Sequence, residues 1–184
     1  CDVTDAREVA LLATHPWVSE GIEVLVLNHG RYDRIDAKSL DYAHLRRTMS
    51  TNFEGSFLVW DSVKSSLNSE ARICVIGSQL GTRGSPHGAD YSASKAALAL
   101  WARSLAQAVG ADGKRVNIIA PGFVDTDILA GDTPEKRASR IEEVPLKRIG
   151  TPDDIAEAVS FLVSDEANYI TGAVIHVNGG LYLP

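Results

Sequence analysis

The sequence predicts an α/β fold built on a doubly wound parallel sheet with helices on both faces. Short apolar runs alternate with helical stretches of ten or more residues, which is the pattern of consecutive βαβ units. The first complete run, residues 22–27, is largely apolar, as strands buried on both faces are. Residues whose side chains could take part in binding or catalysis directly follow several of these runs. They lie at the sheet edge where ligands bind in open parallel sheets.

Cap and turn residues divide the chain into its elements. Residues 1–5 are expected to hold the tail of a strand and a helix start, with Thr4 or Asp5 as the cap. Pro152 suits the first position of a later helix that Thr151 caps. In chain order the predicted elements are a helix over 6–15 continuing to Trp17, a strand over 22–27, a polar loop over 31–39, a helix over 41–67 interrupted at Gly55, a strand over 72–77, a Gly-rich loop over 78–88, a helix over 89–109, a turn at Gly113, a strand over 115–120, an irregular segment over 123–145 with one short helix, a helix over 152–164 and a strand over 173–177.

Composition predicts one globular domain over residues 1–184, with 45% apolar and 23% charged residues. A net charge of −6 without a dense Lys/Arg cluster argues against a nucleic-acid partner. No apolar run is long enough to span a membrane, and no signal-peptide pattern is present. Cys1 and Cys74 form no disulfide framework, and Cys74 is expected to be buried, which fits a reducing, cytoplasmic setting. No metal site is predicted.

The most informative pair is Tyr91 and Lys95, at the start of an Ala- and Leu-rich helix. Residues four apart lie on one face of a helix, so the phenol and the ammonium are expected side by side. A nearby cation lowers a phenol pKa from its ordinary value of about 10. Such a phenol can exchange a proton with a carbonyl or alcohol oxygen near neutral pH. The same spacing is also common on helix surfaces without chemistry, so the pair is a hypothesis that needs support.

Support comes from the residues that end the predicted strands. Asn28 follows the first strand, Ser78 follows the next, and Pro121 with Gly122 closes the third. Taken alone, each of these residues could equally be an ordinary turn residue with no role in chemistry. Because the carboxyl ends of parallel strands meet at one edge, together they predict a single crevice.

In combination these residues resemble the motifs of the short-chain dehydrogenase/reductase family, of the type that includes 3-oxoacyl-[acyl-carrier-protein] reductases. The resemblance covers nearly all of the sequence, and the closing stretch over residues 145–180 is very similar to the reductase type. The matching residues are Tyr91 and Lys95 of YxxxK, Ser78 at the position of the catalytic serine 13 residues earlier, Asn52 of the central helix, Asn28 and Gly30 of NNAG, Asp2 beside the adenine, and residues 121–126 of PGxxxT.

The resemblance implies a Rossmann-like fold and an NAD(P)-dependent oxidoreductase acting on a small carbonyl or secondary alcohol, with NAD or NADP as cofactor. By resemblance, the catalytic residues are Asn52, Ser78, Tyr91 and Lys95. Tyr91 is the general acid/base, Ser78 bonds the substrate oxygen, and Lys95 lowers the phenol pKa and bonds the nicotinamide ribose. Asn52 helps hold a water that relays protons to the lysine. The implied cofactor-binding residues are Asp2, Val3, Asn28, Gly30, Tyr91, Lys95, Pro121, Gly122, Val124 and Thr126. The implied substrate contacts are Ser78, Gln79, His87, Tyr91 and Phe123.

Residues 127–145 are expected to form a mobile lid over the substrate, with their charges on a solvated face. The family resemblance also implies a homo-oligomer, a dimer or tetramer. Leu98, Leu100 and Trp101 fit either a helix seam between subunits or the internal core.

Two departures from the family pattern stand out. His29 replaces a small residue of NNAG near where the adenosine ribose would lie, so ribose contacts or cofactor preference could differ. The family's first strand, its Gly-rich turn for the pyrophosphate and a second βα unit would all precede the position of Cys1. The N-terminal strands of the sheet are therefore expected to be missing, which leaves residues 22–27 as an exposed apolar sheet edge.

Two alternatives to the oxidoreductase remain open. One is a protein of the same fold that no longer catalyses because it lacks the cofactor-binding turn. The other is a non-redox lyase or isomerase that uses the same Ser, Tyr and Lys site. Fold similarity by itself does not decide between them.

Overall fold

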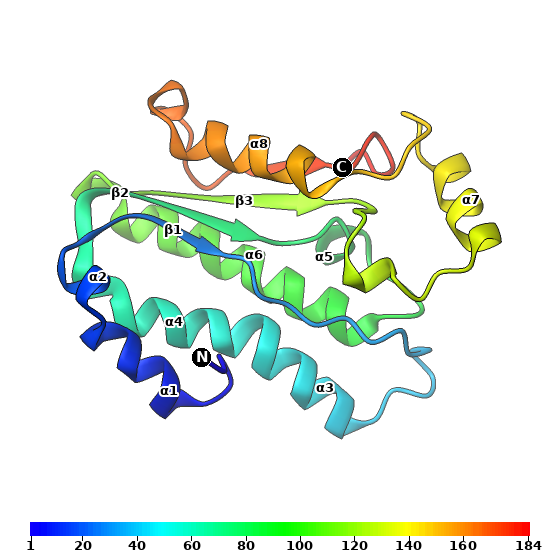
Figure 1. The fold of residues 1–184 in the computed structure, drawn as a ribbon, viewed down its shortest axis with the longest axis horizontal. Helices are drawn as coiled ribbons and strands as arrows, with labels where there is room; N and C mark the ends of the chain where they lie inside the picture. Colours follow the sequence, from blue (N-terminus) through cyan, green and yellow to red (C-terminus); the bar gives the residue numbers. More distant parts are fainter.

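A four-stranded parallel sheet forms the middle layer of the structure, which is a computed structural model that describes all residues from Cys1 to Pro184. Its strands lie in the order of the chain: β1 (Ile22–Leu27), β2 (Leu67–Ile76), β3 (Arg115–Pro121) and β4 (Val174–Val177). Parallel neighbours need crossover connections, and in this fold the crossovers are helical. Helices α4 and α6 cover one face and α8 covers the other (Figure 1). The predicted α/β, Rossmann-like architecture is confirmed.

The N-terminal segment packs on the outside of α4 and contains no strand. It forms α1 (Ala6–Ala10), a 3-10 turn and α2 (Pro16–Ser19), with the Asp5 side chain accepting a hydrogen bond from the Arg7 amide as the α1 cap. The expected strand tail at residues 1–5 is therefore wrong. Asp2 instead closes a local turn, because its carboxylate accepts bonds from the amide and the hydroxyl of Thr4.

The long helical stretch before β2 is one rod with a local change of pitch. It consists of α3 (Tyr42–Met49), a π-helical turn over Ser50–Glu54, α4 (Gly55–Val63) and a 3-10 turn to Ser66. The irregular turn is centred on Asn52, so the expected interruption at Gly55 is slightly misplaced. A Cβ at Gly55 would lie 2.8 Å from the Val3 side chain, so glycine at this position permits the N-terminal segment to approach.

The main core lies between the sheet and the helices α4 and α6 (Ala89–Val109). Leu98, Ala102 and Ala106 recur every four residues along α6 and are buried against β2 and β3. A smaller cluster under α8 contains Cys74 and Leu162. Cys74 is fully buried, as predicted, and free.

Strand β1 pairs only with β2 and is less buried than its composition predicts. Val24 and Val26 point to the α8 side of the sheet and are exposed, because α8 (Pro152–Val163) packs over the other three strands. The prediction of a strand buried on both faces is wrong, whereas the prediction of an exposed apolar edge is confirmed.

The remaining segments surround the carboxyl ends of the strands. A short helix α5 (Leu80–Arg83) occupies the predicted Gly-rich loop, and α7 (Pro134–Glu143) lies in the predicted irregular segment after a 3-10 turn over Asp127–Leu129. Helix α8 begins with a reciprocal cap, in which Thr151 and Asp154 bond each other's backbone amides. No helix is long and apolar enough to cross a membrane.

Candidate active site

A cavity of about 300 Å³ opens at the carboxyl ends of β1, β2 and β3. The parallel register brings the three strand ends to one edge, where the ends of α6 and α8 and the segment before α7 also meet (Figure 1). This cavity is lined by most of the site residues that the sequence predicts: Asn28, Gly30, Ser78, Gln79, Tyr91, Lys95, Pro121, Gly122, Phe123, Val124 and Thr126.

Tyr91 and Lys95 stand one turn apart at the start of α6 and face the cavity together. The Lys95 ammonium lies 5.8 Å from the centre of the Tyr91 ring, so the expected adjacency is present. The ammonium donates one hydrogen bond, 2.7 Å long, to the Ile76 carbonyl at the end of β2. Gly30 lies beside the ammonium, and a Cβ at that position would be in van der Waals contact with Nζ, 3.4 Å away.

Burial, more than charge, sets the ionisation of this pair. Loss of water lowers the pKa of Lys95 from 10.5 to about 8 and raises the pKa of Tyr91 above 10.0. The nearby Ser78 hydroxyl lowers the Tyr91 pKa, but by less than burial raises it. The expectation of a phenol made acidic by its lysine neighbour is therefore wrong for this structure. Both groups are displaced toward their neutral forms because both have lost solvent.

Ser78 and Gln79 follow β2 and are fixed by the backbone around them. The Ser78 hydroxyl accepts a hydrogen bond from the Leu80 amide, which opens the short α5 turn. Gln79 is buried, and its side-chain oxygen accepts a bond from the Asn178 amide group beyond β4. These contacts hold the Ser78 hydroxyl at the cavity wall next to Tyr91.

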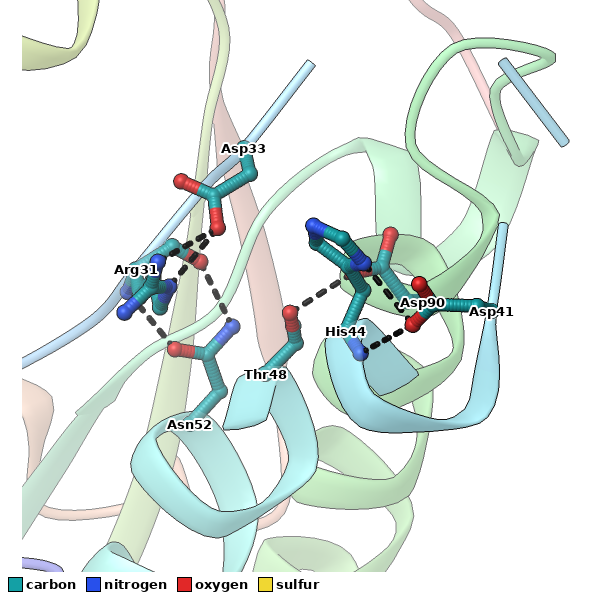
Figure 2. A network of polar contacts seen from close by, with 7 residues as sticks. All are labelled: Arg31, Asp33, Asp41, His44, Thr48, Asn52 and Asp90. Atoms are coloured by element: carbon teal, nitrogen blue, oxygen red, sulfur yellow. Dashed lines mark hydrogen bonds and ion pairs between the residues drawn. The ribbon is translucent and has the colours of Figure 1, made fainter. Parts of the chain in front are cut away.

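Asn52 does not line the cavity, but its side chain joins its own helical turn to the loop after β1 and to α6. Figure 2 shows its bonds with the Arg31 backbone. Its side-chain oxygen accepts from the Arg31 amide at 2.7 Å, and its nitrogen donates to the Arg31 carbonyl at 3.0 Å and to the Ser94 hydroxyl at 2.9 Å. Ser94 in turn donates to the Tyr91 carbonyl. The π-helical turn carries Asn52 into this buried position, from which it fixes the loop after β1 against α6.

A second buried bond joins the same helices one turn earlier. The Thr48 hydroxyl of α3 donates to the Asp90 carboxylate at 2.6 Å, and both side chains are almost fully buried (Figure 2). The other oxygen of Asp90 has no partner within the protein. Asp90 lies in the first turn of α6, where the helix dipole favours a negative charge.

Three predicted contacts lie outside the cavity, and their roles stay predictions. Asp2 and Val3 do not line it: Asp2 is exposed, and Val3 contacts Gly55. The exposed His87 side chain turns toward Asp36, with the ring nitrogen 3.6 Å from the carboxylate. His29, which departs from the family pattern, has its ring nitrogen 3.0 Å from the Ser56 hydroxyl, and burial and Lys95 lower its pKa.

The sequence did not single out several residues that line the cavity: Tyr32, Leu80, Pro152 and Ile155, and, within the segment 127–145 expected to lie over the substrate, Ile128, Leu129 and Arg140. Arg140 of α7 is buried, pairs with Asp132 through two of its nitrogens, and lies 4.4 Å over the Phe123 ring. Nothing in the sequence separates it from neighbouring charged residues of α7. One feature of the sequence could have identified Tyr32 as a cavity residue: it is an aromatic side chain in a largely polar loop directly after a strand end.

Comparison with known proteins supports the relationship suggested by these residues. A family model described as enoyl-(acyl carrier protein) reductase matches residues 1–182. The chain is 35% identical over 184 residues to the 3-oxoacyl-[acyl-carrier-protein] reductase MabA of Mycobacterium bovis, covering 98% of this chain and 74% of that protein. It is 36% identical over 165 residues to FabG of Vibrio cholerae, covering 89% of this chain and 68% of that protein.

Other comparisons agree in fold and differ in extent. The chain is 47% identical over 112 residues to FabG of Salmonella typhimurium, and the aligned region covers 61% of this chain and 46% of that protein. The chain therefore matches about half the length of such relatives. The crystal structure of a short-chain dehydrogenase/reductase of the glucose/ribitol dehydrogenase type from Brucella melitensis superposes with a TM-score of 0.94 at 29% identity. That superposition covers all of this chain and 75% of the Brucella chain.

Proposed function

The chain belongs to the short-chain dehydrogenase/reductase family, and from this premise we propose that it is an oxidoreductase for a carbonyl or secondary alcohol, with NAD or NADP as cofactor. The observation that carries the proposal is the convergence of Ser78, Tyr91 and Lys95 on one cavity at the strand ends. A hydroxyl, a phenol and an ammonium around one small cavity are suited to holding an oxygen atom and exchanging its proton.

The residues at the inner end of the cavity fit the nicotinamide half of such a cofactor. Lys95 is only 4% exposed and uses one of its three donors on Ile76, which leaves two for ribose hydroxyl groups. Gly30 adds no side chain to the cavity beside Lys95, and Gly122 lets Asn178 pack against the backbone, since a Cβ at Gly122 would lie 2.8 Å from Asn178. When bound, the nicotinamide supplies or accepts the hydride.

The protein's own residues handle the proton. A Tyr91 phenol with a raised pKa stays protonated near neutral pH and is a competent donor to a substrate oxygen. In the reductive direction its O–H bond breaks as the alcohol O–H bond forms, which leaves a phenolate beside the Lys95 ammonium. Ser78 donates to the same oxygen and shares the charge that develops there. Asn52 keeps the loop after β1 against α6 and so maintains the position of Tyr91 relative to Ser78.

The cavity favours a compact, largely apolar substrate. Leu80, Phe123 and Ile128 supply apolar wall, and the substrate would share with the nicotinamide a volume at the small end of the range for ligand pockets, roughly 300–1,000 Å³. Because the reductases of Mycobacterium and Vibrio carry 3-oxoacyl-[acyl-carrier-protein] in their names, a short 3-oxoacyl thioester is the first substrate to test.

Two structural features belong to the same proposal. Residues 127–145 act as a lid, because Leu129 and Arg140 of this segment already line the cavity.

The protein assembles as a dimer or tetramer through α4 and α6, where Phe57 and Leu100 are exposed apolar side chains. Light scattering on a sizing column tests the second point directly.

The decisive experiment measures reduced-nicotinamide consumption with acetoacetyl thioester and with simple ketones, using NADH and NADPH in parallel. Tyr91→Phe removes the proton donor and should lower kcat by about 10²- to 10⁴-fold. Tyr42→Phe is the matched control, since Tyr42 is 75% exposed at the start of α3 and touches no part of the cavity. Unchanged turnover in Tyr91→Phe would disprove the proposal. Turnover that needs no nicotinamide would favour a lyase or isomerase.

A further inference from the structure

We propose that Tyr32 is a positioning and size-selecting residue of this cavity, which holds the Tyr91 ring in place and sets the width of substrate that reaches it. The inference deepens the proposed oxidoreductase function and rests on it. Tyr32 comes from the loop after β1, lines the cavity and is half-buried.

The first support is the contact between the two tyrosines. Their ring centres are 4.8 Å apart at an interplanar angle of 63°, an edge-to-face arrangement that aromatic rings favour. Tyr91 has no comparable aromatic neighbour on its other sides. Movement of the Tyr91 ring toward Tyr32 would therefore have to displace the Tyr32 ring.

The second support is that Tyr32 is itself anchored. Its hydroxyl donates a 3.0 Å hydrogen bond to the His87 carbonyl in the loop that leads into α6. The Ala37 amide donates to the Pro86 carbonyl at 2.8 Å, so the two loops are joined at a second point. Because the ring is held from both its backbone and its hydroxyl, it can act as a fixed wall.

The third support is the close approach of Gly88, the residue that precedes the first turn of α6. A Cβ at Gly88 would lie 2.6 Å from the Tyr32 ring, so this position accommodates the ring only as glycine. The loop and helix start are thus shaped around Tyr32. A smaller side chain at position 32 would open space beside Tyr91 and widen the cavity.

The test compares a compact ketone, cyclohexanone, with a broad one, 2-acetylnaphthalene. Tyr32→Ala should lower kcat for cyclohexanone about tenfold through lost orientation of Tyr91, with a smaller change in KM. The same variant should raise kcat/KM for 2-acetylnaphthalene, so the ratio between the two ketones shifts by about 100-fold. Tyr32→Phe keeps the ring but loses the hydrogen bond to the His87 carbonyl, so it should shift that ratio much less than Tyr32→Ala does. Tyr42→Ala is the matched control and should change neither ketone.

Gly88→Ala provides an independent route to the same result. The added methyl displaces the Tyr32 ring in the wild-type background, and it should have little further effect once Tyr32→Ala has removed that ring. Additive losses from the two substitutions, or a ketone ratio unchanged in Tyr32→Ala, would overturn the inference.

A binding measurement separates this inference from the proposed function. Saturation-transfer NMR reports binding of both ketones without turnover. If the wild-type protein reduces neither these ketones nor acetoacetyl thioester, the proposed function fails, and the Tyr32 inference is judged by the binding ratio alone. Tyr32→Ala should then still shift relative binding toward 2-acetylnaphthalene, and an unshifted ratio would refute the inference.

Discussion

Replacement of Asn52 by leucine should destabilise the protein and disturb the cavity at the same time. Asn52 has no exposed surface, and its side chain takes part in three hydrogen bonds, two with the Arg31 backbone and one with Ser94. Leucine has the same number and branching of side-chain heavy atoms but can neither donate nor accept. The substitution therefore removes the hydrogen bonds while keeping the branched shape, although its two methyl groups are somewhat larger than the amide groups they replace.

The expected loss of stability in Asn52→Leu follows from those three hydrogen bonds. A net contribution of about 1 kcal/mol per intramolecular hydrogen bond predicts a loss of about 3 kcal/mol in the free energy of unfolding. For a chain of 184 residues this corresponds to a fall in Tm of about 6–12 °C. The Arg31 amide and carbonyl are partly accessible to water, so they recover some solvation, whereas the Ser94 hydroxyl is buried.

Asn117→Leu is the matched control for this experiment. Asn117 is also buried, and its side chain donates to Ile170 and accepts from Ala173 at the start of β4, far from the cavity residues. By the same reasoning it should lose about 2 kcal/mol. Urea unfolding gives both stabilities, and steady-state kinetics at a temperature where both variants are folded gives the catalytic effect.

The two variants should differ in function despite their similar stabilities. Asn52→Leu releases the loop that carries Arg31 and Tyr32, so kcat/KM should fall at least tenfold, as expected for a displaced active-site wall. Asn117→Leu should leave kcat/KM close to the wild-type value. A loss of less than 1 kcal/mol in Asn52→Leu, or equal kinetic losses in both variants, would refute the idea that Asn52 is the structural hub of the site.

Two further predictions concern buried charges. Thr48→Val removes the only protein donor to the Asp90 carboxylate and should cost about 2–3 kcal/mol in urea unfolding, and Asp90→Asn in that background should restore part of the loss. Lys95→Met should remove a pH dependence of stability. The Lys95 pKa is 10.5 in the unfolded chain and about 8 in the folded one, a difference that corresponds to about 3 kcal/mol. Below pH 8 the folded ammonium bears this cost in full, and it is relieved between pH 8 and 10.5, so the wild type should gain stability relative to Lys95→Met over that range. A constant difference between the two proteins would contradict the burial of a charged Lys95.

Local sequence signals predicted the elements that local forces define. Helix α6 begins at Ala89 and ends at Val109, as expected from an Ala- and Leu-rich run bounded by Gly88 and Gly110. Helix α8 starts at Pro152 because its cap and first turn are complete in sequence. The parallel sheet and the clustering of Ser78 with the Tyr91 helix also follow, because strand ends in this architecture converge on one edge.

Features that depend on tertiary packing were not predictable in this way. The exposure of Val24 and Val26 depends on which strands α8 covers, and a run of apolar residues does not contain that information. The sign of the Tyr91 pKa shift depends on how much water the fold removes, and helical spacing to Lys95 does not report it. Arg140 reaches the cavity only because of the path of residues 127–145.

The positions of the proposed catalytic groups depend on buried polar contacts between segments that are distant in sequence. Asn52 bonds a loop 21 residues before it and a helix 42 residues after it, and Thr48 reaches Asp90 across a similar separation. Buried polar groups are costly unless they are satisfied, so such contacts tolerate few alternative arrangements. The apolar core of α4 and α6 could accept small sliding motions of one helix along the other, but these hydrogen bonds could not. They therefore fix the register of α6 against the loop after β1, and with it the placement of Tyr91 beside Tyr32 and Ser78.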